Sequence, residues 1–467
     1  MESVQQTGSA AGDEKHSSST IYLQSPPNSA AALQKSTPES TAKINSLLQQ
    51  NHDNFHIFSD FEDRLHNHLS HHLLAIYALG ATPENLQFAY DTNAGHLLPI
   101  GEKNAPVVEN LSHSESWGEY LGKAEMYHTF LQFFQNSIDQ VGWQETVKRH
   151  IFSEKGVKDG MPERLVAGFL HPWIHLGYGI EFEQPAIIAE GLAQTAVHDM
   201  WPAVYLQRCQ SEAVASHTSP ENATMKSLFQ EAYGSTKLRE STKWSDPQKN
   251  KAVYANALDE MVALAAKWYI PPTADDETIK QAAAELAAAA AYICATTPRT
   301  DKKVKFDFFL MHCVTSSVFL DVWVRQAWIG NAEKALLLNY FGWMVLNMYV
   351  SRGCAEINLN QVRTYFPKGS HGVEWLGKWE DIAERAVVLK DDGHVAKTVR
   401  ALMNAAEATA PYARRPGFEL RTPLFLKIAE MAVDAAEDCG EGEPLWVRST
   451  GHPEAWENVS GPRLVYD

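Results

Sequence analysis

Apolar residues recur at spacings of three and four along most of the chain from Ile44 onward. This period is typical of helices that bury one face, whereas the alternating pattern of strands is scarce, and no two strand-like runs are joined by Asn-Gly or Asp-Gly. No fixed-period repeat appears, which argues against a solenoid. The pattern therefore predicts an all-α protein in which residues 46–467 form one large helical domain.

Local signals place several of these helices. The stretch from His68 to Leu79 has helical spacing, and Thr82 followed by Pro83 predicts the start of the next helix. The acidic residues 275–277 likewise predict the start of an alanine-rich helix. The run from Phe306 to Trp328 is apolar on most sides, so we expect it to lie at the centre of the domain.

Three segments depart from the helical pattern. Residues 1–45 are rich in Ser, Thr, Gln, Ala and Pro and predict a disordered tail without a secretory signal. Residues 211–251 are polar and predict an insertion at the surface of the single domain. After Ala410 the chain becomes rich in Pro, Gly and Trp, which predicts an irregular C-terminal wrap over the helices.

Two apolar stretches, residues 281–297 and 335–350, superficially resemble membrane spans. The first is mostly alanine and the second is short and contains two asparagines. Each falls below the roughly 20 strongly apolar residues that a span requires. We interpret both as buried helices, so no membrane association is expected.

Charge and cysteine usage narrow the function classes. The chain has 40 basic and 57 acidic residues and a formal net charge of −17, which would repel the phosphates of nucleic acids. The five cysteines are scattered singly, with no Cys-x-x-Cys pair. Their spread indicates a reducing compartment and predicts a cytoplasmic location.

Glycine-rich cofactor motifs are missing. Gly177 and Gly179 lack the third glycine of a dinucleotide-binding loop, and no phosphate-binding loop of the Walker type occurs. A flavin or nicotinamide bound in a Rossmann unit is therefore not expected. A redox reaction would require a metal or the substrate itself to handle the electrons.

Nineteen histidines make metal binding the next question. His312, in FDFFLMHCVTSS, is expected to be buried, either as a hydrogen-bonded core residue or as a ligand. His171 and His175, in GFLHPWIHLGYG, are four residues apart and can share one helix face. His66, His68, His71 and His72 crowd the start of another helix, where Asn67 is a candidate to orient a ligand or to bind substrate.

The segment DDGHVAKTVRAL contributes a more specific pair. His394 and Lys397 are three residues apart and would project from nearly the same helix face. An ammonium repels a cation, but a buried, neutral lysine that captures carbon dioxide becomes an anionic carbamate ligand. The alternative is a solvated lysine on a charged helix flank.

The histidines also allow two other function classes. Adjacent His198 and Asp199 occur in AVHDMW, and such pairs form the core of all-helical, metal-dependent phosphohydrolases. The other alternative is a non-catalytic helical binding protein whose histidines are ordinary core residues.

Four segments in order together resemble the questin oxidase-like family of fungal aromatic polyketide pathways: NHLSHHLLAIYALGATPENLQFAY, GFLHPWIHLGYGIEF with EGLAQTAVHD, FDFFLMHCVTSS, and DDGHVAKTVRAL. The resemblance covers about residues 54–410. It implies oxidative opening of the central quinone ring of an anthraquinone, in a Baeyer-Villiger-like reaction, to give a benzophenone.

The resemblance also implies a non-haem iron held by histidines and a carboxylated lysine. At the matching positions the ligands would be His68, His171, His312, His394 and Lys397. Neighbouring histidines could exchange with two of these: His175 with His171, and His71 or His72 with His68.

Five protein ligands around an octahedral Fe(II) leave one position, which we expect dioxygen to take. The reaction could draw electrons from NADPH through a reductase partner. A flat phenolic substrate requires an apolar pocket with aromatic walls and a few polar groups. The candidate residues for contacting the substrate are Asn67, Trp173, Tyr178, Thr315 and Ser316.

Overall fold

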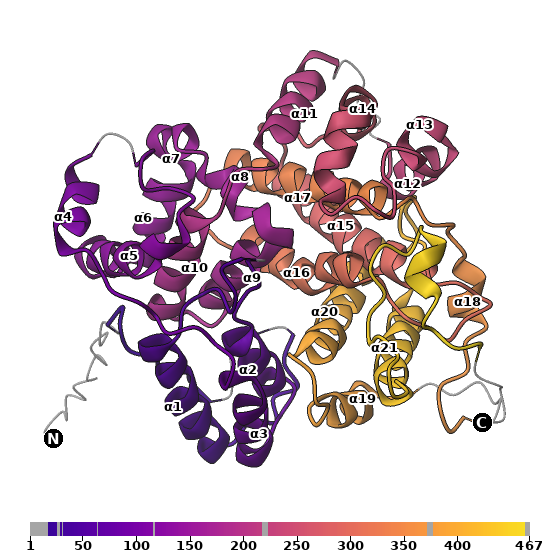
Figure 1. Cartoon of the computed structure of the whole chain (residues 1–467), viewed down its shortest axis with the longest axis horizontal. Coiled ribbons are helices and arrows are strands. Elements are labelled where there is room, and N and C mark those ends of the chain that lie inside the picture. Colours follow the sequence, from indigo (N-terminus) through magenta and orange to yellow (C-terminus); the bar gives the residue numbers. More distant parts are fainter. Residues whose placement is uncertain are drawn as a thin grey trace, which may run out of the picture.

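The computed structural model describes residues 17–25, 29, 31–62, 64–114, 117–216, 223–370 and 377–462. Within these ranges the protein is all-α, as predicted, and only three isolated bridges have β-type pairing. The helices form one body, with the N-terminal helices on one side of the view and the C-terminal helices on the other (Figure 1).

The first half of the chain contains α1 (Pro38–Asn54), α2 (Leu69–Ala78), α3 (Pro83–Ala94), α4 (Ala105–His113), η1 (Ala124–Met126), α5 (Tyr127–Val141), α6 (Trp143–Val147), η2 (Lys148–Phe152), α7 (Glu154–Lys158), α8 (Met161–Leu165), α9 (Ala167–Glu181), α10 (Pro185–Val197), α11 (Ala203–Ser216), α12 (Met225–Gly234) and α13 (Thr236–Arg239). The second half contains α14 (Lys249–Ala265), α15 (Asp276–Thr296), α16 (Phe308–Val324), α17 (Asn331–Ser351), α18 (Leu359–Arg363), α19 (Trp379–Ala386), α20 (His394–Thr409), η3 (Ala410–Tyr412), α21 (Thr422–Glu437) and η4 (Pro453–Trp456).

The predicted helix starts are confirmed, with small shifts. The Thr82 hydroxyl accepts from the Asn85 amide and caps α3, and Asp275 caps the alanine-rich α15 in the same way. Side-chain acceptors at these positions satisfy amides that have no partner inside the helix.

The prediction of a disordered tail over residues 1–45 is wrong for the described part of that segment, since residues 1–16 lie outside it. Ile21 and Leu23 are buried, and α1 begins at Pro38, where Thr37 and Ser40 form a reciprocal capping box. The polar composition concealed this helix, because only the few apolar residues on its inner face, such as Ile44, enter the core.

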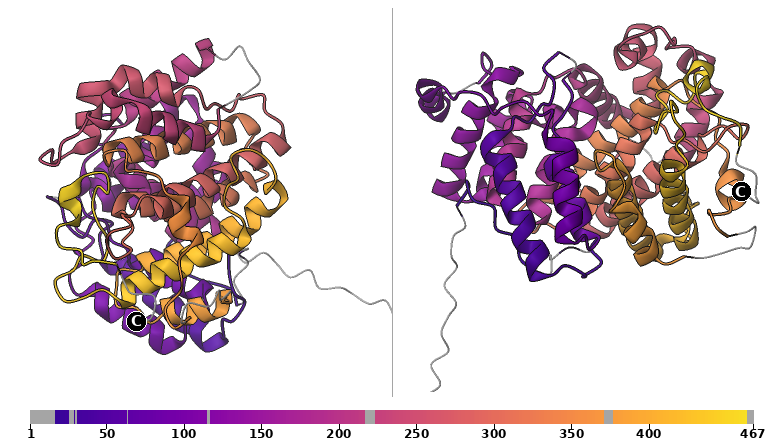
Figure 2. Two further views of the ribbon diagram at one scale, coloured as in Figure 1. Left: turned by 90° about the vertical axis from the view of Figure 1, so that its right-hand side faces the viewer. Right: turned by 60° about the horizontal axis from the view of Figure 1, so that its bottom comes forward.

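Helix α16 is central, as predicted, and packs against α9, α15, α17 and α20. Its buried face belongs to a core that runs through the whole body. The N-terminal α2 contacts both α9 and α20, so helices from opposite ends of the sequence lie side by side (Figure 2). As a result, the first turns of α2, α9, α16 and α20 meet in the interior.

The polar stretch 211–251 carries the end of α11, all of α12 and α13, and the start of α14, at the top of Figure 1. The C-terminal wrap begins later than predicted. Residues 422–437 form α21, with Pro423 in its first turn, where a missing amide hydrogen is tolerated. The surrounding proline and glycine residues masked this helix in the sequence.

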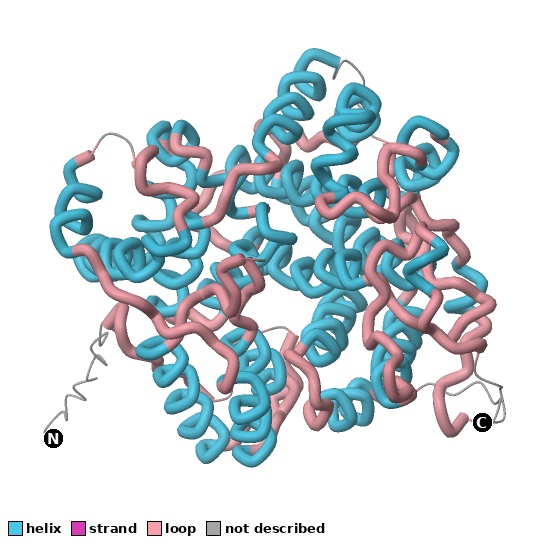
Figure 3. Tube along the Cα trace, in the orientation of Figure 1, coloured by secondary structure: helices cyan, strands magenta, loops and turns pink. Residues whose placement is uncertain are grey.

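Residues 438–462 follow α21 and are largely irregular (Figure 3). We call this segment the C-terminal arm. The two apolar stretches that resemble membrane spans are the buried parts of α15 and α17. Of the helices in the described ranges, none combines the length and the apolar character needed to cross a bilayer.

Candidate metal centre

Four predicted histidines meet where four helices begin. One precedes α2 and the others lie in the first two turns of α9, α16 and α20; we call them the histidine cluster: His68, His171, His312 and His394. The Nε2 atoms of His68 and His171 are 2.8 Å apart, and those of His312 and His394 are 3.3 Å apart. Ring centroids 4.8 Å apart for His171 and His312, and 4.7 Å apart for His68 and His394, connect the two pairs.

Hydrogen bonds to each Nδ1 determine whether the proton of the neutral ring lies on Nδ1 or on Nε2. His171 Nδ1 and His312 Nδ1 each lie 2.6 Å from a backbone carbonyl, of Gly168 and Phe308 respectively, which can only accept. His68 Nδ1 lies 2.8 Å from a carboxylate oxygen of Asp392, and His394 Nδ1 bonds the other oxygen. Every Nδ1 therefore carries the proton, and every Nε2 of the cluster presents a bare lone pair in the neutral ring.

Burial keeps these rings neutral. Desolvation lowers the pKa of His171 and His312 well below the ordinary histidine value and that of His394 to about 3. Burial, followed by the nearby Lys397 ammonium, also lowers the pKa of His68. Lone pairs that face one another at hydrogen-bond distance repel unless a cation lies between them, so this donor set fits a divalent metal with an affinity for imidazole.

Asp392 connects two members of the cluster from outside it. Its carboxylate bonds both His68 and His394, and these contacts lower its own pKa although burial opposes them. Metal-binding imidazoles commonly donate a hydrogen bond from their second ring nitrogen to a carboxylate in this manner. Sequence reasoning missed Asp392, although an acid two residues before a candidate ligand was visible in DDGH.

A tight turn positions His394 at the start of α20. Asp391 accepts from the amides of Gly393 and Val395, and Gly393 has φ +86°. A Cβ atom on Gly393 would lie 2.6 Å from the ring of His72. Only glycine fits here without displacing the ring or straining the backbone.

A left-handed turn positions His171. Gly168, Phe169 and Leu170 have φ of 53°, 53° and 69° at the beginning of α9. Two non-glycine residues in this region represent stored strain, which folded proteins retain mainly at functional sites. The turn brings the Gly168 carbonyl to His171 Nδ1 and leaves the Phe169 ring half-buried.

Lys397 lies one turn after His394 on α20, and its side chain is buried. Desolvation lowers its pKa to about 8, although Asp392 and Asp391 oppose the shift. Its charge depresses the pKa of His68, His312 and His394, which places the amine beside the cluster. The alternative of a solvated lysine on a helix flank is wrong.

The alternative histidines occupy other positions. His71 Nε2 lies 3.0 Å from His175 Nδ1, and His175 in turn bonds Glu190 at 2.7 Å, so this pair faces a buried carboxylate. His66 Nε2 lies 2.9 Å from His198 Nε2, and the His66 ring stacks on His171. Among the described residues, the groups with metal-binding geometry are His68–His171–His312 and His68–Asp392–His394.

The residues predicted to contact substrate are buried and engaged by protein atoms. The amide of Asn67 bonds Asn51 and the backbone of residues 56 and 69. Trp173 Nε1 donates to the Ser316 carbonyl, and the hydroxyls of Thr315 and Ser316 donate to the His312 carbonyl. The Tyr178 ring stacks on His71 at 5.5 Å. These contacts hold the helices together and support the cluster.

Half-buried aromatic rings that the sequence did not single out border the cluster instead. Phe169 lies between Trp201 and Phe309, with centroids 6.4 and 4.6 Å away, and Phe308 follows Phe309 at 5.3 Å. The Phe308 ring is 4.6 Å from His312. We call this series the aromatic strip, which ends at a tryptophan of the C-terminal arm beside His394: Trp201, Phe169, Phe309, Phe308 and Trp446.

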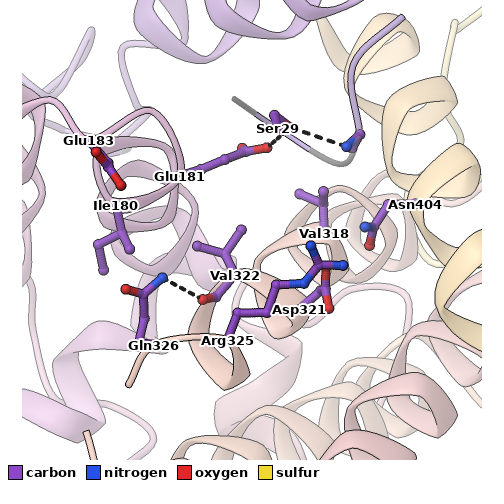
Figure 4. A pocket seen from close by; sticks show the side chains of 11 residues that line it. Ser29, Ile180, Glu181, Glu183, Val318, Asp321, Val322, Arg325, Gln326 and Asn404 are labelled. Carbon is purple, nitrogen blue, oxygen red and sulfur yellow. Dashed lines mark hydrogen bonds and ion pairs between the residues drawn. The ribbon is translucent and has the colours of Figure 1, made fainter. Parts of the chain in front are cut away.

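A cavity of about 200 Å³ lies at the other ends of α9, α16 and α20 (Figure 4). Its lining includes Glu181, Glu183, Asp321 and Arg325, and Figure 4 shows these charged groups around the opening. A charged cavity two to three helical turns from the histidine cluster does not supply the aromatic walls predicted for the substrate. The aromatic strip consists of apolar rings of this kind.

Comparisons with known proteins agree with the resemblance. The family model described as questin oxidase-like matches residues 65–402. A Baeyer-Villiger oxidase of Pestalotiopsis microspora is 35% identical over 434 residues, which cover 90% of this chain and 94% of that protein. A questin oxidase of Aspergillus terreus is 35% identical, covering 89% and 92%. A Baeyer-Villiger monooxygenase of a Cryptosporiopsis species is 33% identical, covering 90% and 94%.

Removing the carboxylate of Asp392 should weaken metal binding. Asp392→Ala leaves two imidazoles of the cluster without their outer partner, and the expected loss of affinity is about 10- to 100-fold. Anaerobic calorimetric titration with Fe(II) measures it. The matched control is Asp259→Ala, whose side chain is 83% exposed. Equal affinities for the two variants would contradict this role.

Acidification should destabilise the metal-free protein. The cluster stays neutral when folded, whereas unfolded histidines bind protons near pH 6.5, so the unfolded state gains protons as the pH falls below that value. Each buried ring then lowers the free energy of unfolding by up to about 1.4 kcal/mol per pH unit. Asp391 opposes this effect. Burial raises its pKa to about 6, so the folded state binds one proton there as the pH falls.

Chemical denaturation at pH 7 and pH 5 checks this prediction. The decrease should be smaller in His171→Gln, which has one fewer buried imidazole. A free energy of unfolding that does not change between the two pH values would refute it.

Proposed function

The chain belongs to the questin oxidase-like family, and from this premise we propose that it is an oxidoreductase that opens the central quinone ring of an anthraquinone at a non-haem iron. The product would be a benzophenone in aromatic polyketide biosynthesis. Names such as oxidase and monooxygenase among the relatives support redox chemistry. The convergence of four Nε2 lone pairs is the observation that carries the metal assignment.

The histidine cluster and Lys397 would hold the iron, and the bound iron would supply the activation of dioxygen. Four neutral imidazoles contribute no charge, so an anionic ligand is needed to balance a ferrous ion. A neutral Lys397 amine can attack carbon dioxide, forming a carbamate and releasing a proton. Burial lowers the pKa of Lys397 to about 8, so a substantial fraction of the amine is neutral in mildly alkaline solution.

The aromatic strip would bind the flat substrate next to the cluster. Phe308 contacts both His312 and His394, so a ring stacked along the strip would bring its quinone carbonyl toward the metal side. The buried rings of His171, His312 and His394 exclude water from this side. His68, half-buried, would lie nearest to the exposed approach through Asp392.

A Baeyer-Villiger-like reaction inserts one oxygen atom between the quinone carbonyl and a ring carbon. The second oxygen atom of dioxygen leaves as water, with two electrons from NADPH delivered through a reductase partner and two protons. Hydrolysis of the resulting ester adds water and opens the ring to a benzophenone with a carboxylic acid and a new phenol. The oxygen insertion and the ester hydrolysis together conserve atoms and electrons.

The competing hydrolase assignment has weaker geometric support. His198 faces His66, and its neighbour Asp199 is a 48% exposed side chain near Arg64. The Asp199 carboxylate faces solvent and the His198 ring pairs with His66, so the two side chains do not converge as the ligands of a metal site do. Family membership also favours redox chemistry over hydrolysis and over a purely structural role for the histidines.

Turnover under labelled dioxygen tests the assignment. Iron-loaded protein with an anthraquinone panel, NADPH and a reductase should give a ring-opened product that contains oxygen-18, detected by mass spectrometry. His394→Ala should lose at least about 100-fold in rate, because it removes a donor from the cluster, whereas Asp199→Asn should retain most of the activity. Ring opening without any label, or equal losses in the two variants, would contradict the proposal.

Substituting Lys397 tests the carbamate separately. Lys397→Gln should bind iron at least about tenfold more weakly, since it cannot supply the anionic ligand. Bicarbonate during reconstitution should raise the iron content of the wild type but not of this variant. Lys427→Gln, in which a lysine that bonds the Arg363 carbonyl is replaced, is the matched control. Full iron binding by Lys397→Gln would exclude the carbamate.

A further inference from the structure

We propose that Arg448 on the C-terminal arm binds an oxygen anion of the substrate and so selects phenolic aromatic molecules. This inference rests on the proposed function, because it assigns a recognition residue to the same site. It is carried by the position of the arm, the uncompensated charge of Arg448 and an unsatisfied donor on Trp446.

Backbone pairing fixes the arm against the start of α16. The Val447 amide donates to the Phe306 carbonyl at 3.1 Å, and the Phe308 amide donates to the Val447 carbonyl at 2.8 Å. The buried Asp307 carboxylate accepts from the amides of Ser449 and Thr450, both at 2.8 Å. This stretch of the arm is therefore held next to the residues that lead into His312.

The pairing places Arg448 over the aromatic strip and Trp446 at the end of the strip. Trp446 and Arg448 flank the buried Val447, which forms an isolated bridge with Asp307. The Arg448 guanidinium lies 4.5 Å above the Phe308 ring, and the Trp446 ring lies 6.2 Å from that of His394. Arg448 thus covers a ring that contacts His312, and Trp446 lies beside His394.

Arg448 carries a positive charge that its surroundings do not balance. It is exposed, and no described carboxylate lies within ion-pair distance of it. Its neighbour Arg352 covers the adjacent Phe309 ring at 4.0 Å but is buried, bonds Asn250 and has Asp307 nearby. Two guanidinium groups over neighbouring phenyl rings, one of them uncompensated, favour an anion on this face.

Trp446 adds a neutral donor at the same place. Its indole N–H is buried and has no acceptor among the described residues. A buried donor that is left unpaired destabilises the protein. A substrate oxygen on the aromatic strip would offset that cost. A phenolate oxygen at Arg448 and a neighbouring oxygen at Trp446 match a hydroxylated quinone rather than an unsubstituted hydrocarbon.

Binding without turnover tests the proposal. Iron-loaded full-length protein is titrated under nitrogen at pH 8 with 2-hydroxyanthraquinone and 2-methoxyanthraquinone, monitored by absorbance. Neither probe has a hydroxyl beside the carbonyl, so chelation of the iron does not confuse the comparison. The wild type should bind the hydroxy compound at least about tenfold more tightly than the methoxy compound.

Arg448→Gln should reduce that ratio to about one and leave the affinity for the methoxy compound within about twofold, whereas Arg448→Lys should restore part of the preference. Arg208→Gln, an exposed arginine paired with Asp259, should retain the wild-type ratio. An unchanged ratio in Arg448→Gln, an equal loss for both compounds, or equal binding of both by the wild type would each overturn the proposal.

The outcome is separable from the fate of the proposed function. If the wild type discriminates through Arg448 but does not open the quinone ring in air, the recognition site stands and the reaction assignment fails. If ring opening proceeds and Arg448→Gln does not alter the ratio, the recognition site fails and the reaction stands.

Discussion

The mutual repulsion of four imidazole lone pairs is the constraint on which the site depends. Each ring of the histidine cluster is tied through Nδ1 to an acceptor that cannot give a proton back, so each Nε2 is left bare and directed at another. Burial prevents the rings from escaping the repulsion by protonation. Such an arrangement in the protein interior suits a cation, and the binding of a metal would offset the cost of assembling it.

The fold creates this arrangement by bringing helix beginnings together. The first turns of α2, α9, α16 and α20 converge because α2, from the N-terminal part of the chain, packs against the C-terminal α20. Local turns and hydrogen bonds then orient the rings. The left-handed turn before His171 supplies a carbonyl, and the glycine before His394 allows a sharp entry into α20. Asp392 links two of the rings, so neither can turn away independently.

The sequence was informative where local rules decide the structure. Helical spacing and capping residues such as Thr82 and Asp275 predicted the elements, and the resemblance predicted which histidines converge. The side chains that we propose as substrate walls were not found in this way. Thr315 and Ser316 looked available but bond their own helix, whereas Trp446 reaches His394 only through the pairing of a distant arm. Contacts between segments that are far apart in the chain do not produce a periodic pattern in the sequence, so periodicity cannot predict them.

X-ray absorption at the iron edge shows whether the histidine cluster binds iron. Full-length protein is loaded anaerobically with Fe(II), freed of unbound metal and measured. The account predicts retained iron whose ligand shell shows the multiple scattering of several imidazoles together with oxygen ligands. Iron that is washed out, or a ligand shell of oxygen atoms without imidazole scattering, would contradict it.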